Sequence, residues 1–249
     1  MKGSCKKLGL AVALIGAWLL GTTPSANANL ILTLDDLGTV GIDIIIVDNV
    51  DGGVGTETLK GASTTADGDA LSGVINYTGA VGNFSVNATT GISKPVIGSG
   101  GIGTIGLSSV SVSGGAGTLQ IMLTDTGFNA PFDVIILANL LGGTTNGTIL
   151  AQGFLDTANA EFGDSFSLPK QGLFGPGSFS STVSKSAGVV VASYSLTDIV
   201  TIVHTEAGQF TSFGKQLTAT PTPEPSTMLL LGSGLAGLGF FRRRRKREA

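Results

Sequence analysis

Short runs of β-branched residues, each bounded by glycine and small polar residues, recur along the middle of the chain and limit the folds open to it. Runs rich in Val, Ile and Thr occupy residues 42–50, 74–78, 104–113, 118–124, 133–140, 189–196 and 198–204. Clusters of Gly, Asn, Asp and Ser separate these runs, as expected for short strands joined by turns. Many short strands with frequent turns are typical of antiparallel sandwiches and related barrels. We therefore expect an all-β domain, an antiparallel β-sandwich or a jelly-roll-like fold.

One segment in the middle of the chain allows a more detailed prediction. Residues 109–113 alternate serine with valine, so we expect the serines at the surface and Val110 and Val112 in the core. Residues 114–117 then form a glycine-rich turn that leads into the apolar run 118–123. We expect the two runs to pair as a β-hairpin.

Two segments 90 residues apart resemble each other. Residues 43–53 and 133–143 both begin with Asp, continue through apolar residues and end in Gly-Gly. Two equivalent strands in a pseudo-symmetric sandwich would account for the similarity. So would chance in a chain rich in Gly, Thr and Ile.

The N-terminus has the three parts of an export signal. A positive region (Lys2, Lys6 and Lys7) precedes an apolar run at residues 8–20, and Ala26-Asn27-Ala28 then offers an A-x-A cleavage site. The apolar run is too short for a membrane span, which needs about 20 residues. We therefore expect residues 1–28 to be a signal peptide cleaved after Ala28, with Ala26 and Ala28 as the small residues of the site.

The C-terminal residues 220–249 combine a short polar motif, an apolar segment and a basic cap. The motif is Pro223-Glu224-Pro225, the apolar segment covers residues 226–241, and the cap is Arg242, Arg243, Arg244, Arg245, Lys246 and Arg247. An apolar segment partitions into a bilayer, and a cluster of cations stops its translocation. The run 228–241 is about 21 Å long as a helix, against a hydrocarbon core of about 30 Å. We expect a short membrane helix that is transient or spans a thinned bilayer.

This tail resembles the PEP-CTERM sorting tail of exported bacterial proteins, and the triplet Pro223-Glu224-Pro225 is the marker of that family. The resemblance implies cleavage near the triplet by a membrane-embedded exosortase, in a bacterium that makes exopolysaccharide. It also implies a protein tethered to the inner membrane and then transferred to the cell surface or extracellular matrix. Tails of this type are also described as an ice-binding protein C-terminal domain, which by itself does not imply ice binding.

The ectodomain, residues 29–219, is acidic. Of the 14 Lys and Arg, three lie in the signal peptide and six in the basic cap, which leaves five lysines. Of the 17 Asp and Glu, 15 lie in the ectodomain, so its net charge is about −10. Such a surface repels nucleic acid and anionic lipid. The only cysteine, Cys5, lies in the signal peptide, so the ectodomain has no disulfide and must be stabilised by its core.

Residues suited to catalysis are scarce. The G-x-G-x-x-G matches at 98–103 and 232–237 lack the strand-turn-helix context of a nucleotide site. No G-x-S-x-G is present, and His204 is the only histidine. We expect His204 at a strand end, facing solvent, and no zinc site, because a zinc ion would need carboxylates for nearly all its ligands. Carboxylate pairs for glycoside hydrolysis are not excluded by residue type.

Two acidic clusters are candidates for calcium binding. Asp48 and Asp51 form one, and Asp67 and Asp69 the other, each on an expected loop. Ca²⁺ prefers such oxygen ligands, but neither cluster matches the 12-residue EF-hand loop, and turns favour Asp for backbone reasons.

The ectodomain has no Trp and only two tyrosines, Tyr77 and Tyr194, which argues against sugar-stacking sites. The sequence thus predicts a non-enzymatic exported surface or matrix protein, without cofactor, whose Ser- and Thr-rich faces could bind extracellular polysaccharide. A calcium-dependent adhesin or carbohydrate-binding domain is the alternative, followed by an extracellular hydrolase.

Overall fold

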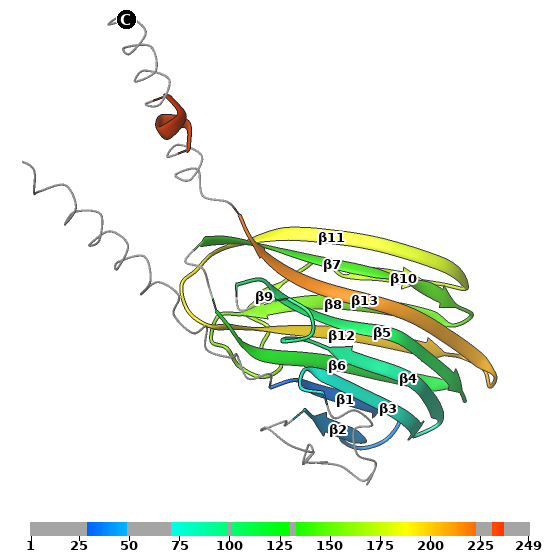
Figure 1. The fold of residues 1–249 in the computed structure, drawn as a ribbon. Coiled ribbons are helices and arrows are strands. Elements are labelled where there is room, and N and C mark those ends of the chain that lie inside the picture. Colours follow the sequence, from blue (N-terminus) through cyan, green and yellow to red (C-terminus); the bar gives the residue numbers. More distant parts are fainter. Residues whose placement is uncertain (1–28, 49–70, 99–100, 130–132, 223–230, 237–249) are drawn as a thin grey trace, which may run out of the picture.

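The computed structural model describes residues 29–48, 71–98, 101–129, 133–222 and 231–236, and its strands form two antiparallel sheets packed face to face (Figure 1). The strands are β1 (Ile31–Asp36), β2 (Ile44–Val47), β3 (Val74–Val81), β4 (Phe84–Ile92), β5 (Gly103–Gly114), β6 (Gly117–Phe128), β7 (Asp133–Thr145), β8 (Thr148–Asp156), β9 (Phe166–Ser167), β10 (Gln171–Phe174), β11 (Gly177–Val190), β12 (Tyr194–His204) and β13 (Gln209–Pro221). The expected all-β sandwich is confirmed.

Each sheet is assembled from strands that are distant in sequence. The seven-stranded sheet has the order β10-β8-β12-β6-β1-β2, with β9 paired to β8. The six-stranded sheet has the order β11-β7-β13-β5-β4-β3. All strand pairs are antiparallel. The last strand, β13, therefore lies inside the six-stranded sheet, where β7 and β5 hold it on both sides.

The core lies between the two sheets and is made of aliphatic residues that alternate with outward-facing ones. In β7, Ile135, Leu137 and Leu141 are fully buried, whereas Ile136 and Leu140 are exposed. The same alternation, with period two, is the reason that a run of this type folds as a strand with one face against a core. The predicted burial of Val110 and Val112 beneath exposed serines is confirmed.

The predicted hairpin between residues 109–113 and 118–123 is wrong. β5 pairs with β13 and β4, whereas β6 pairs with β1 and β12 in the other sheet. The glycine turn between them carries the chain from one sheet to the other, and Gly115 donates a backbone hydrogen bond to Asn83 O of 2.9 Å. A strand that buries one face has the same alternation in either arrangement, so the local pattern could not distinguish a hairpin from a crossing.

The similarity between residues 43–53 and 133–143 does not reflect equivalent strands. β2 is an edge strand of the seven-stranded sheet, and β7 is an interior strand of the six-stranded sheet. The two runs are also out of phase, because Ile44 and Ile46 are buried while the aligned Val134 and Ile136 face outward. A one-residue offset moves every side chain to the opposite face.

Six strands, β1, β4, β8, β9, β10 and β13, were not among the predicted runs, and β11 overlaps them only at Val189 and Val190. β13 continues beyond the expected end of the ectodomain at residue 219 as far as Pro221, and Thr222 N donates a 2.9 Å hydrogen bond to Val134 O. β1 begins and β13 ends at the same end of the sandwich (Figure 1). The described domain therefore begins and ends at the same end of the sandwich.

Candidate functional site

A trough crosses the outer face of the six-stranded sheet, the face directed away from the core. Its volume is about 490 Å³, within the range of ligand sites. We call it the glycine trough, and its lining residues come from β4, the loop after β4, β5, β13, β7 and β11: Ile92, Ile97, Gly106, Leu107, Ser108, Gly214, Lys215, Gln216, Leu140, Leu141, Gly142 and Ser180.

Glycines form the floor of the trough, and the backbone does not require them there. Gly106, Gly142 and Gly214 have no left-handed φ angle. A Cβ at Gly142 would meet only Phe179 O at 3.7 Å, and one at Gly214 only Leu107 O at 3.9 Å, which are ordinary contact distances. At the adjacent Gly143, by contrast, a Cβ would lie 2.1 Å from a backbone oxygen. Gly142 and Gly214 are therefore not explained by packing, and their missing side chains leave the trough open.

The register of the strands sets these glycines side by side. Gly214 pairs with Gly142, and Gly142 pairs with Ser180. One row further along the strands, Gly106 pairs with both Ile92 and Gln216. The trough thus runs across the strands. The row of Gly214, Gly142 and Ser180 contains small residues, and the next row contains the larger side chains of Ile92 and Gln216.

The groups that face the trough are neutral. Ser108, Ser180 and Gln216 are exposed and bring hydroxyl and amide groups, while Ile92, Ile97 and Leu140 bring aliphatic surface. Lys215 contributes to the floor, but its side chain is directed inward and is fully buried. The trough can therefore bind a neutral ligand through hydrogen bonds and aliphatic contacts.

An ion pair between the sheets lies beneath the trough. Lys215 of β13 pairs with Asp198 of β12, and both side chains are fully buried. Lys215 Nζ also donates to Ile199 O (3.1 Å) and Gln152 O (3.3 Å), and Asn139 Nδ2 donates to Asp198 Oδ1 (3.3 Å). Burial lowers the pKa of Lys215 and raises the pKa of Asp198, and their mutual attraction opposes both shifts. The pair connects the central strands of the two sheets.

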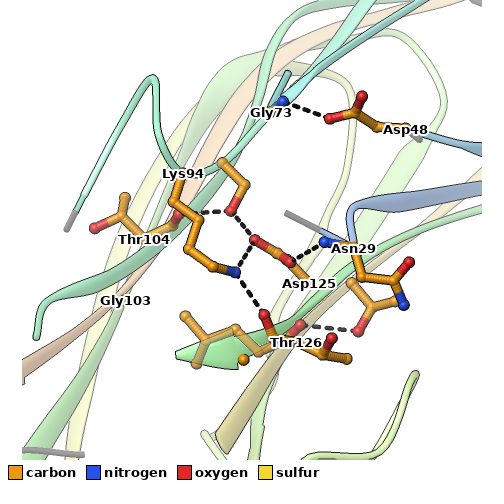
Figure 2. Close-up of polar contacts among 12 residues, drawn as sticks. Asn29, Asp48, Gly73, Lys94, Gly103, Thr104, Asp125 and Thr126 are labelled. Atoms are coloured by element: carbon orange, nitrogen blue, oxygen red, sulfur yellow. Dashed lines mark hydrogen bonds and ion pairs between the residues drawn. The ribbon is translucent and has the colours of Figure 1, made fainter. Parts of the chain in front are cut away.

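A second buried ion pair lies at the end of the sandwich where β1 begins (Figure 2). Lys94 Nζ lies 2.8 Å from Asp125 Oδ2 and 4.0 Å from the centre of the Phe128 ring. Ser93 Oγ donates to the same carboxylate oxygen, and Lys94 Nζ also donates to Thr126 O. Burial lowers the pKa of Lys94, and the attraction of Asp125 partly offsets this effect. Asn29 N donates to the other oxygen of Asp125 at 3.0 Å.

The predicted solvent exposure of His204 is wrong. His204 is buried, with 1 % of its surface exposed, although it does end a strand. Its Nε2 lies 3.1 Å from Thr211 Oγ1, its ring packs against Phe84 at 5.6 Å between centroids, and burial lowers its pKa. The alternation of β12 places residues 198, 200, 202 and 204 toward the core, and this parity could have been read from the sequence.

The predicted calcium ligands are only partly covered by the described residues. Asp48 is buried rather than displayed on a loop, and its carboxylate accepts a hydrogen bond from Gly73 N. Asp51, Asp67 and Asp69 lie outside the described residues. Within the described ranges, three or more His, Cys, Asp or Glu side chains nowhere come together as a metal site would require. Calcium binding by the remaining aspartates stays a prediction.

The two tyrosines of the ectodomain are both buried. Tyr77 OH donates to Ala80 O at 2.9 Å. Tyr194 OH accepts from Gly103 N at 3.2 Å, and burial raises the pKa of Tyr194 to about 12. Neither ring is available to stack on a sugar.

The residues of the predicted export signals lie outside the described residues. These are Ala26, Ala28, Pro223, Glu224, Pro225, Arg242, Arg243, Arg244, Arg245, Lys246 and Arg247. Residues 231–236, within the apolar segment, are helical and exposed. A helix with the length and apolar character of a membrane span is not found in the part of the chain that the structure describes. The signal peptide and the membrane helix stay predictions.

Comparison with protein families addresses the tail directly. The family model described as the PEP-CTERM protein-sorting motif matches residues 221–246. The chain carries a PEP-CTERM sorting motif. This motif marks an exported protein anchored by its C-terminal tail and implies processing by an exosortase. The match begins at the last residue of β13, so the sorting motif follows the folded domain directly.

The solved structures that resemble the chain include distant likenesses to a carbohydrate-binding module and to a tailspike domain. The chain is 11 % identical to the carbohydrate-binding module TmCBM61 in complex with β-1,4-galactotriose, with a TM-score of 0.30, over 56 % of this chain and 90 % of the module. The enzymatically active domain of tailspike protein 4 from bacteriophage CBA120 is 12 % identical, with a TM-score of 0.28, over 54 % of this chain and 19 % of the tailspike.

A third likeness is to the isomalto-dextranase of Arthrobacter globiformis T6 complexed with panose. It is 10 % identical, with a TM-score of 0.24, over 75 % of this chain and 29 % of the enzyme. Likenesses at these TM-scores carry no functional argument. A search of curated proteins found no match.

The glycine trough itself was missed by sequence reasoning. Gly142 and Gly143 stand out in the sequence only as the Gly-Gly end of the segment that resembles residues 43–53, and Gly106 and Gly214 belong to no motif. A signal was present, because a glycine inside a strand marks a bulge or a place where another chain approaches the backbone. Only the pairing of β5, β13 and β7, however, brings the three glycines together.

Proposed function

We propose that the protein is a non-enzymatic exported surface or matrix protein, and that its glycine trough binds a neutral extracellular polysaccharide. The observation that carries this proposal is the open, neutral trough, in which Gly142 and Gly214 are not explained by packing. The PEP-CTERM motif supports the location, because it marks export to the compartment where such a polymer accumulates.

The shape of the trough suits an extended polymer. The trough lies across five adjacent strands, β4, β5, β13, β7 and β11. Strands in a sheet are about 4.8 Å apart, so its length is about 19 Å. A glycine floor exposes a flat backbone surface and leaves room for a chain to lie along it. A small compact ligand would not need a trough of this length.

The chemistry of the trough suits a neutral sugar chain. Sugar hydroxyls can exchange hydrogen bonds with Ser108, Ser180 and Gln216, and the C–H faces of the rings can contact Ile92 and Leu140. The trough lacks aromatic side chains. Each site should therefore bind weakly, with a Kd of about 1 mM, and a repetitive polymer would compensate through multivalency.

Five buried titratable groups of the described domain serve the fold. Lys215 and Asp198 pair with each other in the core, Lys94 pairs with Asp125, and His204 contacts Thr211. None of these five groups presents its charged or titratable atoms to the trough. This arrangement supports a binding role over a hydrolytic one.

The location follows from the tail. We infer that the apolar segment 226–241 and the basic cap hold the new protein in the inner membrane until an exosortase cuts near Pro223-Glu224-Pro225. The domain is then released or attached at the cell surface.

The test compares two leucine substitutions made in the full chain and purified after export. Gly214→Leu fills the trough, whereas Gly175→Leu lies in the loop between β10 and β11, where a Cβ would meet no atom within 4 Å. Binding is measured by co-sedimentation with the exopolysaccharide of the producing bacterium, and melting temperature reports folding. We expect Gly214→Leu to weaken binding at least tenfold and Gly175→Leu to bind as the wild type, with both variants folded. If folded Gly214→Leu protein binds the polymer like the wild type, the trough is not the binding site.

A further inference from the structure

The backbone nitrogen of the first residue of the predicted mature chain, Asn29, is hydrogen-bonded to a buried carboxylate. Asn29 N donates a hydrogen bond of 3.0 Å to Asp125 Oδ1, and Leu30, the next residue, is fully buried. Signal-peptide cleavage after Ala28 would convert this amide into an α-ammonium group. The nitrogen atom that acquires the positive charge already lies within ion-pair distance of Asp125.

Two acidic side chains, Asp125 and Glu161, accept hydrogen bonds from Asn29. Asp125 also pairs with Lys94 at 2.8 Å, and Asn29 Nδ2 donates to Glu161 Oε1 at 2.7 Å. Asp48, the residue after β2, contacts the neighbouring Leu30, because its backbone N–H donates to Leu30 O at 2.8 Å. The Asp48 carboxylate accepts a hydrogen bond from Gly73 N. In these described contacts the cation Lys94 pairs with Asp125, whereas Glu161 accepts from a neutral amide. A cation at Asn29 N would add a positive charge that contacts Asp125 directly, on the residue that also bonds Glu161.

We propose that signal-peptide removal between Ala28 and Asn29 completes this cluster, and that the new α-ammonium group of Asn29 forms an ion pair with Asp125 that stabilises the mature domain (Figure 2). The cleavage hydrolyses the peptide bond between residues 28 and 29: water supplies the hydroxyl of the new carboxylate and the hydrogen of the amine, which then binds a proton. This inference concerns maturation and does not depend on the function of the trough.

The position of the cleavage is restricted by geometry. A cut one residue later would place the ammonium on Leu30, whose side chain is fully buried, and would remove the nitrogen that contacts Asp125. A cut two residues earlier would move the charge about 7 Å along the chain. Only the bond after Ala28 places the charge on the nitrogen that contacts Asp125. The A-x-A site at residues 26–28 and the contact at Asn29 therefore select the same bond independently.

The ion pair has a predictable pH dependence. An α-amino group has an ordinary pKa of about 7.7–8.0, and an adjacent carboxylate raises the pKa of an ammonium group. A group whose pKa is raised on folding contributes its full stabilisation below its unfolded pKa and loses it as the pH rises through its folded pKa. The contribution of Asn29 should thus be complete below about pH 7 and absent well above pH 9.

The test inserts Gly-Ser between Ala28 and Asn29 in the full chain, so that the A-x-A site is kept and the mature N-terminus is displaced by two residues. The exported products are identified by their N-terminal mass and are melted from pH 6 to pH 10. We expect the insertion to lower the melting temperature by about 3–6 °C at pH 6.5 and by less than about 1 °C at pH 10. The backbone hydrogen bond of Asn29 is retained in the insertion variant, so the difference reports the charge.

Two matched variants separate the charge from local disruption. Asn29→Ala loses the contact with Glu161 but keeps the ammonium, and should retain the pH-dependent difference from the insertion variant. In an Asp125→Asn background the insertion should change the melting temperature by less than about 1 °C at any pH. If Asp125→Asn does not fold, acylation of the α-amine at pH 7 serves instead. This reaction should be at least tenfold slower in the folded wild type than in urea.

An N-terminus other than Asn29, or an insertion effect that is the same at pH 6.5 and pH 10, would overturn the proposal. So would an α-amine that is acylated equally fast in the folded and unfolded chain.

Discussion

Replacement of Lys215 by methionine tests the buried ion pair beneath the trough. The substitution removes the cation that faces Asp198 and two hydrogen bonds to the carbonyls of Ile199 and Gln152, but it keeps most of the side-chain volume. Asp198 retains a hydrogen bond from Asn139 but stays in the core without a counter-charge. Removal of one partner of a buried ion pair costs about 3–5 kcal/mol of stability.

This loss can be converted into a melting temperature. For a domain of this size, 1 kcal/mol corresponds to about 2–4 °C, so the melting temperature of Lys215→Met should fall by about 6–20 °C. Urea unfolding followed by circular dichroism measures the free energy directly. Lys170→Met is the matched control, because Lys170 is exposed, and its effect should lie within about 0.5 kcal/mol of zero.

A double variant identifies the cause of the loss. Lys215→Met with Asp198→Asn removes both charges and keeps an amide that can bond Asn139. It should be more stable than Lys215→Met alone, because the uncompensated carboxylate has gone. A loss below about 1 kcal/mol in Lys215→Met, or a double variant that is as unstable as the sum of the two single variants, would refute the reasoning.

Three further predictions concern the remaining polar groups. Burial lowers the pKa of His204 in the folded protein. As the pH falls below about 6.5, the unfolded chain therefore binds more protons at this residue than the folded protein does, and the stability of the domain decreases. His204→Gln should show a smaller loss of melting temperature between pH 7 and pH 5 than the wild type, and equal losses would contradict the assignment. Glu224→Ala should leave exported protein that retains residues 223–249, and a product of unchanged mass would show that the motif does not direct cleavage. Because the Asp48 carboxylate is buried and bonded to Gly73 N, we expect millimolar Ca²⁺ to leave the melting temperature unchanged, whereas a clear rise would establish a calcium site.

Much of the local structure follows from the chain alone. The alternation in residues 109–113 predicted which side chains are buried, and the frequent turns predicted an antiparallel sandwich. The sorting tail could also be identified, because an apolar segment followed by cations acts through its composition and order. Such signals need no partner elsewhere in the chain.

The candidate site could not be predicted in the same way. Gly106, Gly142 and Gly214 lie in three different strands, and only strand pairing places them in adjacent rows. The contacts of Asn29 with Asp125 and of Lys215 with Asp198 likewise join residues far apart in sequence. A charged residue in an alternating run can face either solvent or a partner across the core, and the run itself is identical in both cases.

The amino-acid order by itself determined that this protein is exported, sorted through its tail and built from strands, because each of these properties depends on neighbouring residues. The tertiary structure alone decided that β5 and β6 lie in opposite sheets, that His204 and Asp48 are buried, and that three glycines open a trough. The physical reason is that burial and electrostatic pairing depend on which distant strands meet, and that choice minimises the free energy of the whole domain rather than of any one segment.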